Sequence, residues 1–131
     1  MSDLHDKIQR TIEDEPVVLF MKGTPDLAMC GNSQRAIDAL RGAGAPITAV
    51  NILPDPAIRQ ELSAISGWPT IPQVFIKGEL IGGADIVEEL HGSGELEARL
   101  EAGLGSGYRS SSGEERVVEL APGSGSFRFA R

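Results

Sequence analysis

Apolar residues in the first hundred positions follow two patterns, helical spacing and short unbroken runs. Leu4, Ile8 and Ile12 recur at helical spacing and Pro16 ends the pattern, which predicts a helix. Residues 17–21 are all apolar and include β-branched and aromatic side chains, so they predict a strand buried on both faces.

Further helices, a second buried strand over residues 47–52 and a hairpin follow in the sequence. Asp55-Pro56 opens one helix with an acidic cap and a proline in its first turn. Residues 74–76 and 80–81 predict the hairpin, and Asp85-Ile86-Val87-Glu88 resembles a capping box that opens another helix. The apolar faces of the helices are formed by Ala36, Ile37 and Leu40, by Ile58, Leu62 and Ile65, and by Leu96 and Leu100.

The predicted order is therefore helix, strand, helix, strand, helix, hairpin and helix. A strand–helix–strand opening implies a parallel pair of strands, whereas a hairpin is antiparallel. Together they predict an α/β fold with a mixed four-stranded sheet and helices on both faces, the layout of a thioredoxin-like fold.

Glycine and serine crowd the sequence after Gly103. This change in composition predicts a compact domain over residues 1–104 and a flexible tail over residues 105–131. The apolar segments 116–120 and 127–131 leave a second possibility open, a hairpin that would need a surface to lie on.

The net charge and the hydropathy of the chain argue against two functional classes, nucleic-acid binders and membrane-spanning proteins. The net charge of −7 argues against a general nucleic-acid binder, and no apolar run reaches the roughly 20 residues that span a bilayer. The N-terminus lacks the pattern of a signal peptide. A single unpaired cysteine suits a reducing compartment, and we expect the cytoplasm.

Cys30 is the only cysteine and stands at the predicted start of a helix. By itself a free cysteine is often a buried, inert filler. At a helix N-terminus, however, unpaired N–H groups and the helix dipole favour the thiolate. Lys22 follows the first strand and is placed to add a positive charge, although a solvated strand end is its simpler interpretation.

Two further motifs carry residues that are suited to binding a ligand. In Trp68-Pro69-Thr70-Ile71-Pro72-Gln73, Pro72 is a candidate for a cis peptide bond, which would turn the backbone of Ile71 outward to pair with a peptide-like ligand. In Gly82-Gly83-Ala84-Asp85, the glycines allow close approach of a ligand and the following helix offers N–H donors. Asp85 would accept from an amine, or serve simply as a helix cap.

These motifs, together with Lys22-Gly23-Thr24-Pro25 and Cys30-Gly31-Asn32-Ser33, resemble a monothiol glutaredoxin over about residues 2–104. The resemblance implies a thioredoxin-like fold with a cis Pro72 and a groove for glutathione. Lys22 and Arg59 would hold the glycine-end carboxylate and Ile71 would pair with the cysteinyl backbone. Gly83, Ala84 and Asp85 would meet the γ-glutamyl end.

The resemblance also implies an iron–sulfur carrier. A [2Fe–2S] cluster would be bridged between two protomers by Cys30 and one glutathione from each, and passed to acceptor proteins, with a BolA-like protein as a further partner. Two alternatives stay open. One is a weak monothiol oxidoreductase in which Cys30 removes glutathione from protein thiols; the other is an adaptor that binds a BolA-like partner without a cluster.

Three positions depart from the family pattern. Asn32 replaces a phenylalanine beside the thiol, Ala28 replaces a proline, and Ala84 stands where many members carry a second cysteine. The amide of Asn32 brings hydrogen-bonding groups where an aromatic ring would shield a cluster. We therefore expect glutathione binding to tolerate these changes better than cluster stability does.

Overall fold

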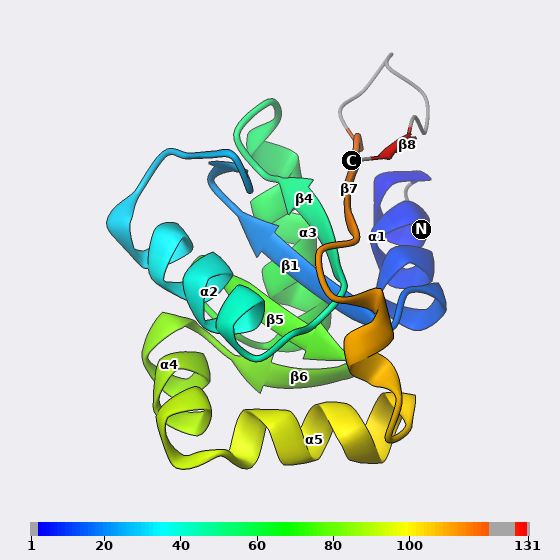
Figure 1. Cartoon of the computed structure of the whole chain (residues 1–131). Coiled ribbons are helices and arrows are strands. Elements are labelled where there is room, and N and C mark those ends of the chain that lie inside the picture. Colours follow the sequence, from blue (N-terminus) through cyan, green and yellow to red (C-terminus); the bar gives the residue numbers. More distant parts are fainter. Residues whose placement is uncertain (1–2, 121–127, 131) are drawn as a thin grey trace.

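A computed structural model describes residues 3–120 and the strand at residues 128–130. A six-stranded mixed sheet lies at its centre in the order β6-β5-β1-β4-β7-β8. Helices α2, α4 and α5 cover one face and α1 and α3 the other (Figure 1). The main elements are α1 (Asp3–Asp14), β1 (Val17–Met21), α2 (Gly31–Gly42), β4 (Ile47–Asn51), α3 (Pro56–Ser66), β5 (Gln73–Ile76), β6 (Glu79–Gly82), α4 (Ala84–Ser93), α5 (Glu95–Leu104), β7 (Glu115–Val118) and β8 (Arg128–Ala130).

Strand β1 consists of apolar residues only, and both of its faces are covered by helices. Val17, Leu19 and Met21 pack into the core under α2 and α4, while Val18 and Phe20 pack under α1 and α3. All five are buried. Because side chains alternate across a strand, a central strand covered on both faces needs apolar residues at every position. The thioredoxin-like α/β prediction is confirmed.

Local details differ from the prediction at two places. The capping box at Asp85 is wrong, because the N-cap of α4 is Gly83 and Asp85 lies within the first turn. Glu88 does not fold back onto the cap but pairs with Arg35 of α2. The loop before Cys30 contains a small hairpin formed by β2 (Gly23–Thr24) and β3 (Leu27–Ala28), which the sequence analysis did not anticipate.

The sheet has six strands rather than the four expected, because the C-terminal segment joins it. Residues 105–120 were expected to be flexible, yet they form a 3₁₀ turn at Tyr108–Ser111 and strand β7, which pairs in parallel with β4. Tyr108, Val117, Val118 and Leu120 are buried, so this segment contributes apolar area that a flexible tail lacks. Strand β8 then pairs antiparallel with β7. The proposed hairpin thus forms in part, and its residues 121–127 and 131 lie outside the described residues.

Polar contacts also hold this segment to the domain. The Tyr108 hydroxyl donates to the Ala43 carbonyl at 2.8 Å, and Arg41 forms an ion pair with Glu115 at 2.7 Å. Arg116 pairs with the carboxylate of Glu15, which is only 6% exposed and also accepts a 2.9 Å hydrogen bond from Thr48.

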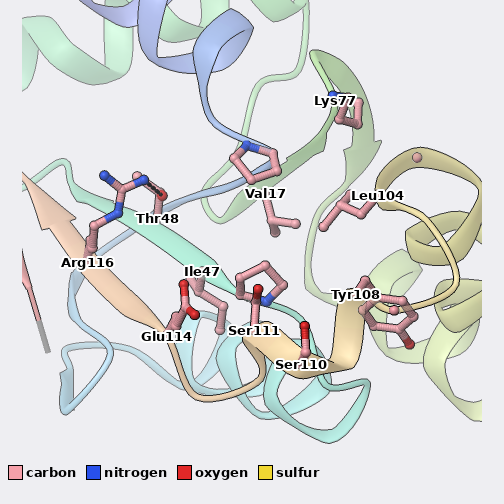
Figure 2. A pocket seen from close by; sticks show the side chains of 14 residues that line it. Val17, Ile47, Thr48, Lys77, Leu104, Tyr108, Ser110, Ser111, Glu114 and Arg116 are labelled. Carbon is pink, nitrogen blue, oxygen red and sulfur yellow. Dashed lines mark hydrogen bonds between the residues drawn. The ribbon is translucent and has the colours of Figure 1, made fainter.

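A hollow of about 560 Å³ lies between the C-terminal segment and the core. Pro16, Leu104, Tyr108 and Arg116 are among its lining residues (Figure 2). It is at the amino end of β1, since Val17 is the first residue of that strand, whereas Lys22 and Cys30 follow the last one. This hollow is therefore remote from the chemistry predicted at Cys30. Among the described residues, no helix has the length and apolarity to span a membrane.

We expect Arg116→Met to lower the free energy of unfolding by about 2 kcal/mol, because the buried Glu15 carboxylate loses its ion pair with the Arg116 guanidinium. Urea denaturation followed by circular dichroism measures the change. The control is Arg99→Met, which removes an exposed ion pair on α5 and is expected to cost less than about 0.5 kcal/mol. Adding Glu15→Gln to Arg116→Met should recover part of the loss, and an equal effect of Arg116→Met and Arg99→Met would contradict this account.

Candidate functional site

Cys30 is the N-cap residue of α2, as predicted, and it is partly exposed. The Ser33 backbone N–H donates to its sulfur at 3.4 Å, and Ser33 Oγ lies 3.3 Å from the sulfur. Ser33 is fully buried, and its hydroxyl oxygen accepts a 3.0 Å hydrogen bond from the Lys22 backbone N–H. The hydroxyl proton of Ser33 is therefore available to a thiolate at Cys30.

The pKa of the Cys30 thiol is lowered from its ordinary value. Partial burial is the largest single effect and acts to raise this pKa, but four smaller effects together outweigh it, the first two being the hydrogen bonds from the Ser33 hydroxyl and backbone N–H. The charge of Lys22 and the backbone N–H of Asn32 lower it further. A thiol with a lowered pKa is both a better metal ligand and a larger source of nucleophilic thiolate at neutral pH.

Lys22 and Arg59, the two cations expected at the glycine-end carboxylate, line one hollow. It has a volume of about 650 Å³ and is lined also by Ile52, Leu53 and Pro56. Arg59 on α3 donates to the Pro69 carbonyl at 3.3 Å, which leaves other guanidinium N–H groups for a ligand. This end of the site therefore offers two cations beside an apolar wall.

The Ile71–Pro72 peptide bond is cis, as predicted. The preceding loop is held from inside by Gln73, whose side-chain amide donates to the carbonyls of Trp68 and Thr70 at 3.0 and 3.1 Å. Gln73 is fully buried, so these hydrogen bonds are shielded from water. These two hydrogen bonds therefore hold the loop in place on which Ile71 lies.

A second hollow, of about 270 Å³, has Asn32 of α2 in its wall, two residues after Cys30 in the sequence. Its walls come from Ile71 and Pro72, from Gly83, Ala84 and Asp85, and from Asn32. A Cβ atom at Gly83 would lie 3.3 Å from both the Pro72 carbonyl oxygen and Trp68 Nε1, so glycine keeps the loop and α4 close together. The N-cap Gly83 provides no side-chain cap for α4, which leaves first-turn N–H groups open to a ligand.

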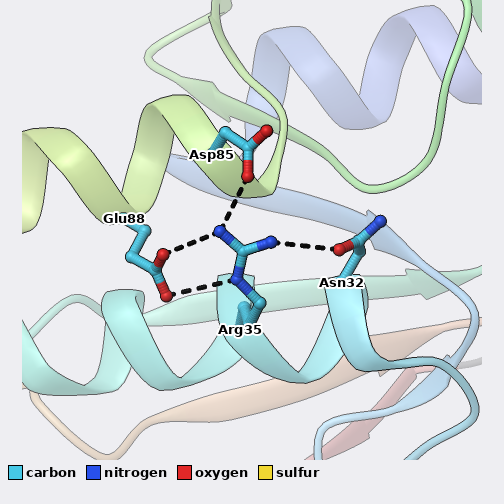
Figure 3. Close-up of polar contacts among 4 residues, drawn as sticks. All are labelled: Asn32, Arg35, Asp85 and Glu88. Atoms are coloured by element: carbon cyan, nitrogen blue, oxygen red, sulfur yellow. Dashed lines mark hydrogen bonds and ion pairs between the residues drawn. The ribbon is translucent and has the colours of Figure 1, made fainter.

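Arg35 is the site residue that sequence reasoning missed. It lies one turn into α2 and donates to Asp85 and Glu88 of α4 at 2.7 Å each, and to Asn32 at 3.1 Å (Figure 3). The hydrogen bonds that Arg35 donates to Glu88 and Asp85 raise the pKa of Arg35, and the same pairing lowers the pKa of Glu88. The only signal in the sequence was the pair of acids at Asp85 and Glu88, which had been assigned to a helix cap.

The described residues of one copy of the chain offer few side chains that could ligate a metal together. Within the described residues, no group of three or more Cys, His, Asp or Glu side chains is placed to hold a metal ion. Cys30 is thus a single protein ligand. A closed metal site needs further ligands from another molecule.

We expect Ser33→Ala to raise the pKa of Cys30, because the thiolate loses the hydroxyl donor. The rate of alkylation by iodoacetamide rises with pH through this pKa, so its midpoint should move to higher pH in the variant. In the unsubstituted chain the midpoint should lie below that of a free cysteine, about 8.5. Ser110→Ala is the control, since Ser110 lies in the C-terminal segment remote from Cys30. An unchanged midpoint in Ser33→Ala would show that its hydroxyl does not stabilise the thiolate.

Comparison with known proteins agrees with this site. The protein-family model described as Glutaredoxin matches residues 17–81. The chain is 47% identical over 97 residues to glutaredoxin 4 of Escherichia coli, covering 74% of this chain and 84% of that one. It is 50% identical over 97 residues to monothiol glutaredoxin-S11 of Oryza sativa, of which it spans only 20%.

Solved structures show the same fold. Reduced apo GrxS14 of poplar has a TM-score of 0.69 and 43% sequence identity, covering 79% of this chain and 94% of that chain. A buckwheat glutaredoxin–glutathione complex has a TM-score of 0.66 and 30% identity, covering 76% and 88%. With a single cysteine, which is the N-cap of α2, and a cis peptide bond before Pro72, the chain belongs to the monothiol glutaredoxin family.

Proposed function

We propose that this protein binds glutathione along the line that joins the two hollows. The tripeptide carries a carboxylate at one end and an amino-acid group at the other. Lys22 and Arg59 suit the glycine carboxylate, and Ile71 suits the peptide backbone. Gly83, Ala84 and Asp85 at the start of α4 suit the γ-glutamyl end, and this placement brings the ligand sulfur to Cys30.

We further propose that the bound pair of sulfurs carries a [2Fe–2S] cluster as cargo. The observation that carries the proposal is the environment of Cys30, a partly exposed sulfur with a lowered pKa whose neighbours Lys22 and Asn32 each line one of the two hollows. Four thiolates complete such a cluster, so two protomers would each supply Cys30 and one glutathione. Acceptor proteins and a BolA-like protein are the proposed partners, and the cytoplasm, as a reducing compartment, is the proposed location.

A second candidate function follows from the lowered pKa of Cys30. Its thiolate would attack the glutathione sulfur of a glutathionylated protein, forming a Cys30–glutathione disulfide and releasing the protein thiolate. A second glutathione thiolate would then attack that disulfide, releasing oxidised glutathione and restoring the Cys30 thiolate. Atoms and electrons balance without another oxidant or reductant.

Anaerobic incubation with iron, sulfide and glutathione should produce a coloured dimer, observed by visible absorbance and size-exclusion chromatography. Omitting glutathione or introducing Cys30→Ser should abolish both colour and dimer, because each removes half of the thiolates. At a glutathione concentration that saturates both proteins, Asn32→Phe should slow the loss of colour in air, since an aromatic ring shields the cluster better than an amide. A colourless monomer that still binds glutathione would contradict the carrier function.

Turnover separates the second candidate from the first. Release of glutathione from a glutathionylated peptide, faster than with free glutathione alone and lost in Cys30→Ser, would support oxidoreductase activity. Rates no faster than free glutathione would leave the carrier function as the better account.

Lys22→Met and Arg59→Met should each weaken glutathione binding about tenfold, because each removes a charge-assisted hydrogen bond to the glycine carboxylate. NMR titration in a Cys30→Ser background measures the dissociation constants without disulfide chemistry. Lys7→Met on α1 is a matched control that removes one positive charge outside the groove. Equal affinities in all three variants would contradict the placement of glutathione.

A further inference from the structure

Arg35 is held in one orientation by three side chains of two helices. Its Nε and Nη2 atoms donate to the two carboxylate oxygens of Glu88 at 3.2 and 2.7 Å. Nη2 also donates to Asp85 Oδ1 at 2.7 Å, and Nη1 donates to Asn32 Oδ1 at 3.1 Å. The paired contact with Glu88 fixes the plane of the guanidinium and therefore the direction of its remaining donors.

This arrangement determines which way the Asn32 amide points. A guanidinium has donors and no acceptor, so only the oxygen of the amide can face it. The Nδ2 group must therefore point away from Arg35, as Figure 3 shows. No described residue accepts from Nδ2, although Asn32 is one of the residues that line the hollow of Ile71, Gly83 and Asp85.

The same hollow receives a carboxylate oxygen from its other wall. The Asp85 side chain is 88% exposed, and only its Oδ1 is used by Arg35. The lining of the hollow thus includes a side-chain amide from α2 whose nitrogen is not used by Arg35, a carboxylate from α4 and the first turn of α4, whose N-cap has no side-chain hydrogen bond. An α-amino acid group, with one carboxylate and one ammonium, has the complementary pair of charges.

We propose that Asn32, oriented by Arg35, recognises the α-carboxylate of an amino-acid end group, whose ammonium binds Asp85 in the same hollow. The proposal rests on the proposed function, in which that group is the γ-glutamyl end of glutathione. Asn32 acts as a specificity-determining residue, and Arg35 acts as a positioning residue through the amide. The pairing requires asparagine at position 32, because a phenylalanine has neither the acceptor for Arg35 nor the donor for a ligand.

The test compares two ligands in a Cys30→Ser background by NMR titration. One is glutathione, and the other is 4-aminobutanoyl-cysteinylglycine, which lacks only the α-carboxylate. Asn32→Leu keeps the size of the side chain without its donor, and Asn32→Asp keeps the oxygen that Arg35 needs but replaces the donor. Both should weaken glutathione five- to tenfold and change the affinity for the analogue less than twofold.

Two controls separate recognition from a general effect on α2. Gln34→Leu removes a neighbouring amide that pairs with Asp38 and does not line the hollow, so both ligands should bind as before. In the Cys30→Ser protein, the Asn32 side-chain amide signal should shift with glutathione and not with the analogue. Arg35→Met should reduce the effect of Asn32→Leu on glutathione affinity, because the amide is then no longer oriented.

Each outcome is decisive. If Asn32→Leu weakens both ligands equally, or weakens neither, the inference is overturned while glutathione binding stands. If Asn32→Leu changes the affinity for glutathione by the same factor in the presence of Arg35 and in the Arg35→Met background, the positioning role of Arg35 is overturned. If the Cys30→Ser protein binds no glutathione at all, the proposed function fails, and this inference fails with it.

Discussion

The buried hydroxyl of Ser33 is the contact on which the site depends. It accepts a hydrogen bond from the Lys22 backbone at the end of β1 and lies 3.3 Å from the sulfur of Cys30. One side chain therefore joins the central strand, the start of α2 and the thiol. Because Ser33 is fully buried, its loss would leave the Lys22 N–H without a partner as well as the thiolate without a donor.

Most of the fold could be predicted from the sequence, because its two strongest signals are local. The apolar run at 17–21 required a strand buried on both faces, and Asp55 caps α3 with Pro56 in the first turn, as expected. The C-terminal segment was harder, since its glycine and serine content resembles a flexible tail. Its few apolar residues, such as Tyr108 and Val117, do not by themselves predict a strand. They indicate one only once the fold shows that β4 has an edge with which this segment can pair.

The candidate site divides in the same way. The positions of Cys30, Lys22 and Ile71 followed from motifs, and the cis bond before Pro72 is confirmed. The contacts of Arg35 were not predictable, because they join α2 to α4 across 50 residues of sequence. Asn32 looked like a loss of shielding beside the thiol, whereas the structure shows it as part of a polar network that faces a hollow. The contact of Asn32 with Arg35, which the residue type alone does not reveal, thus determines how Asn32 is interpreted.

The central claim is that Cys30 is one half of a site that glutathione completes. Native mass spectrometry of the anaerobically reconstituted protein tests it most directly, because it counts every component of the assembly. The account predicts a mass equal to two chains, one [2Fe–2S] cluster and two glutathione molecules. A cluster-bearing species without glutathione, or a protein that stays monomeric and metal-free under these conditions, would contradict it.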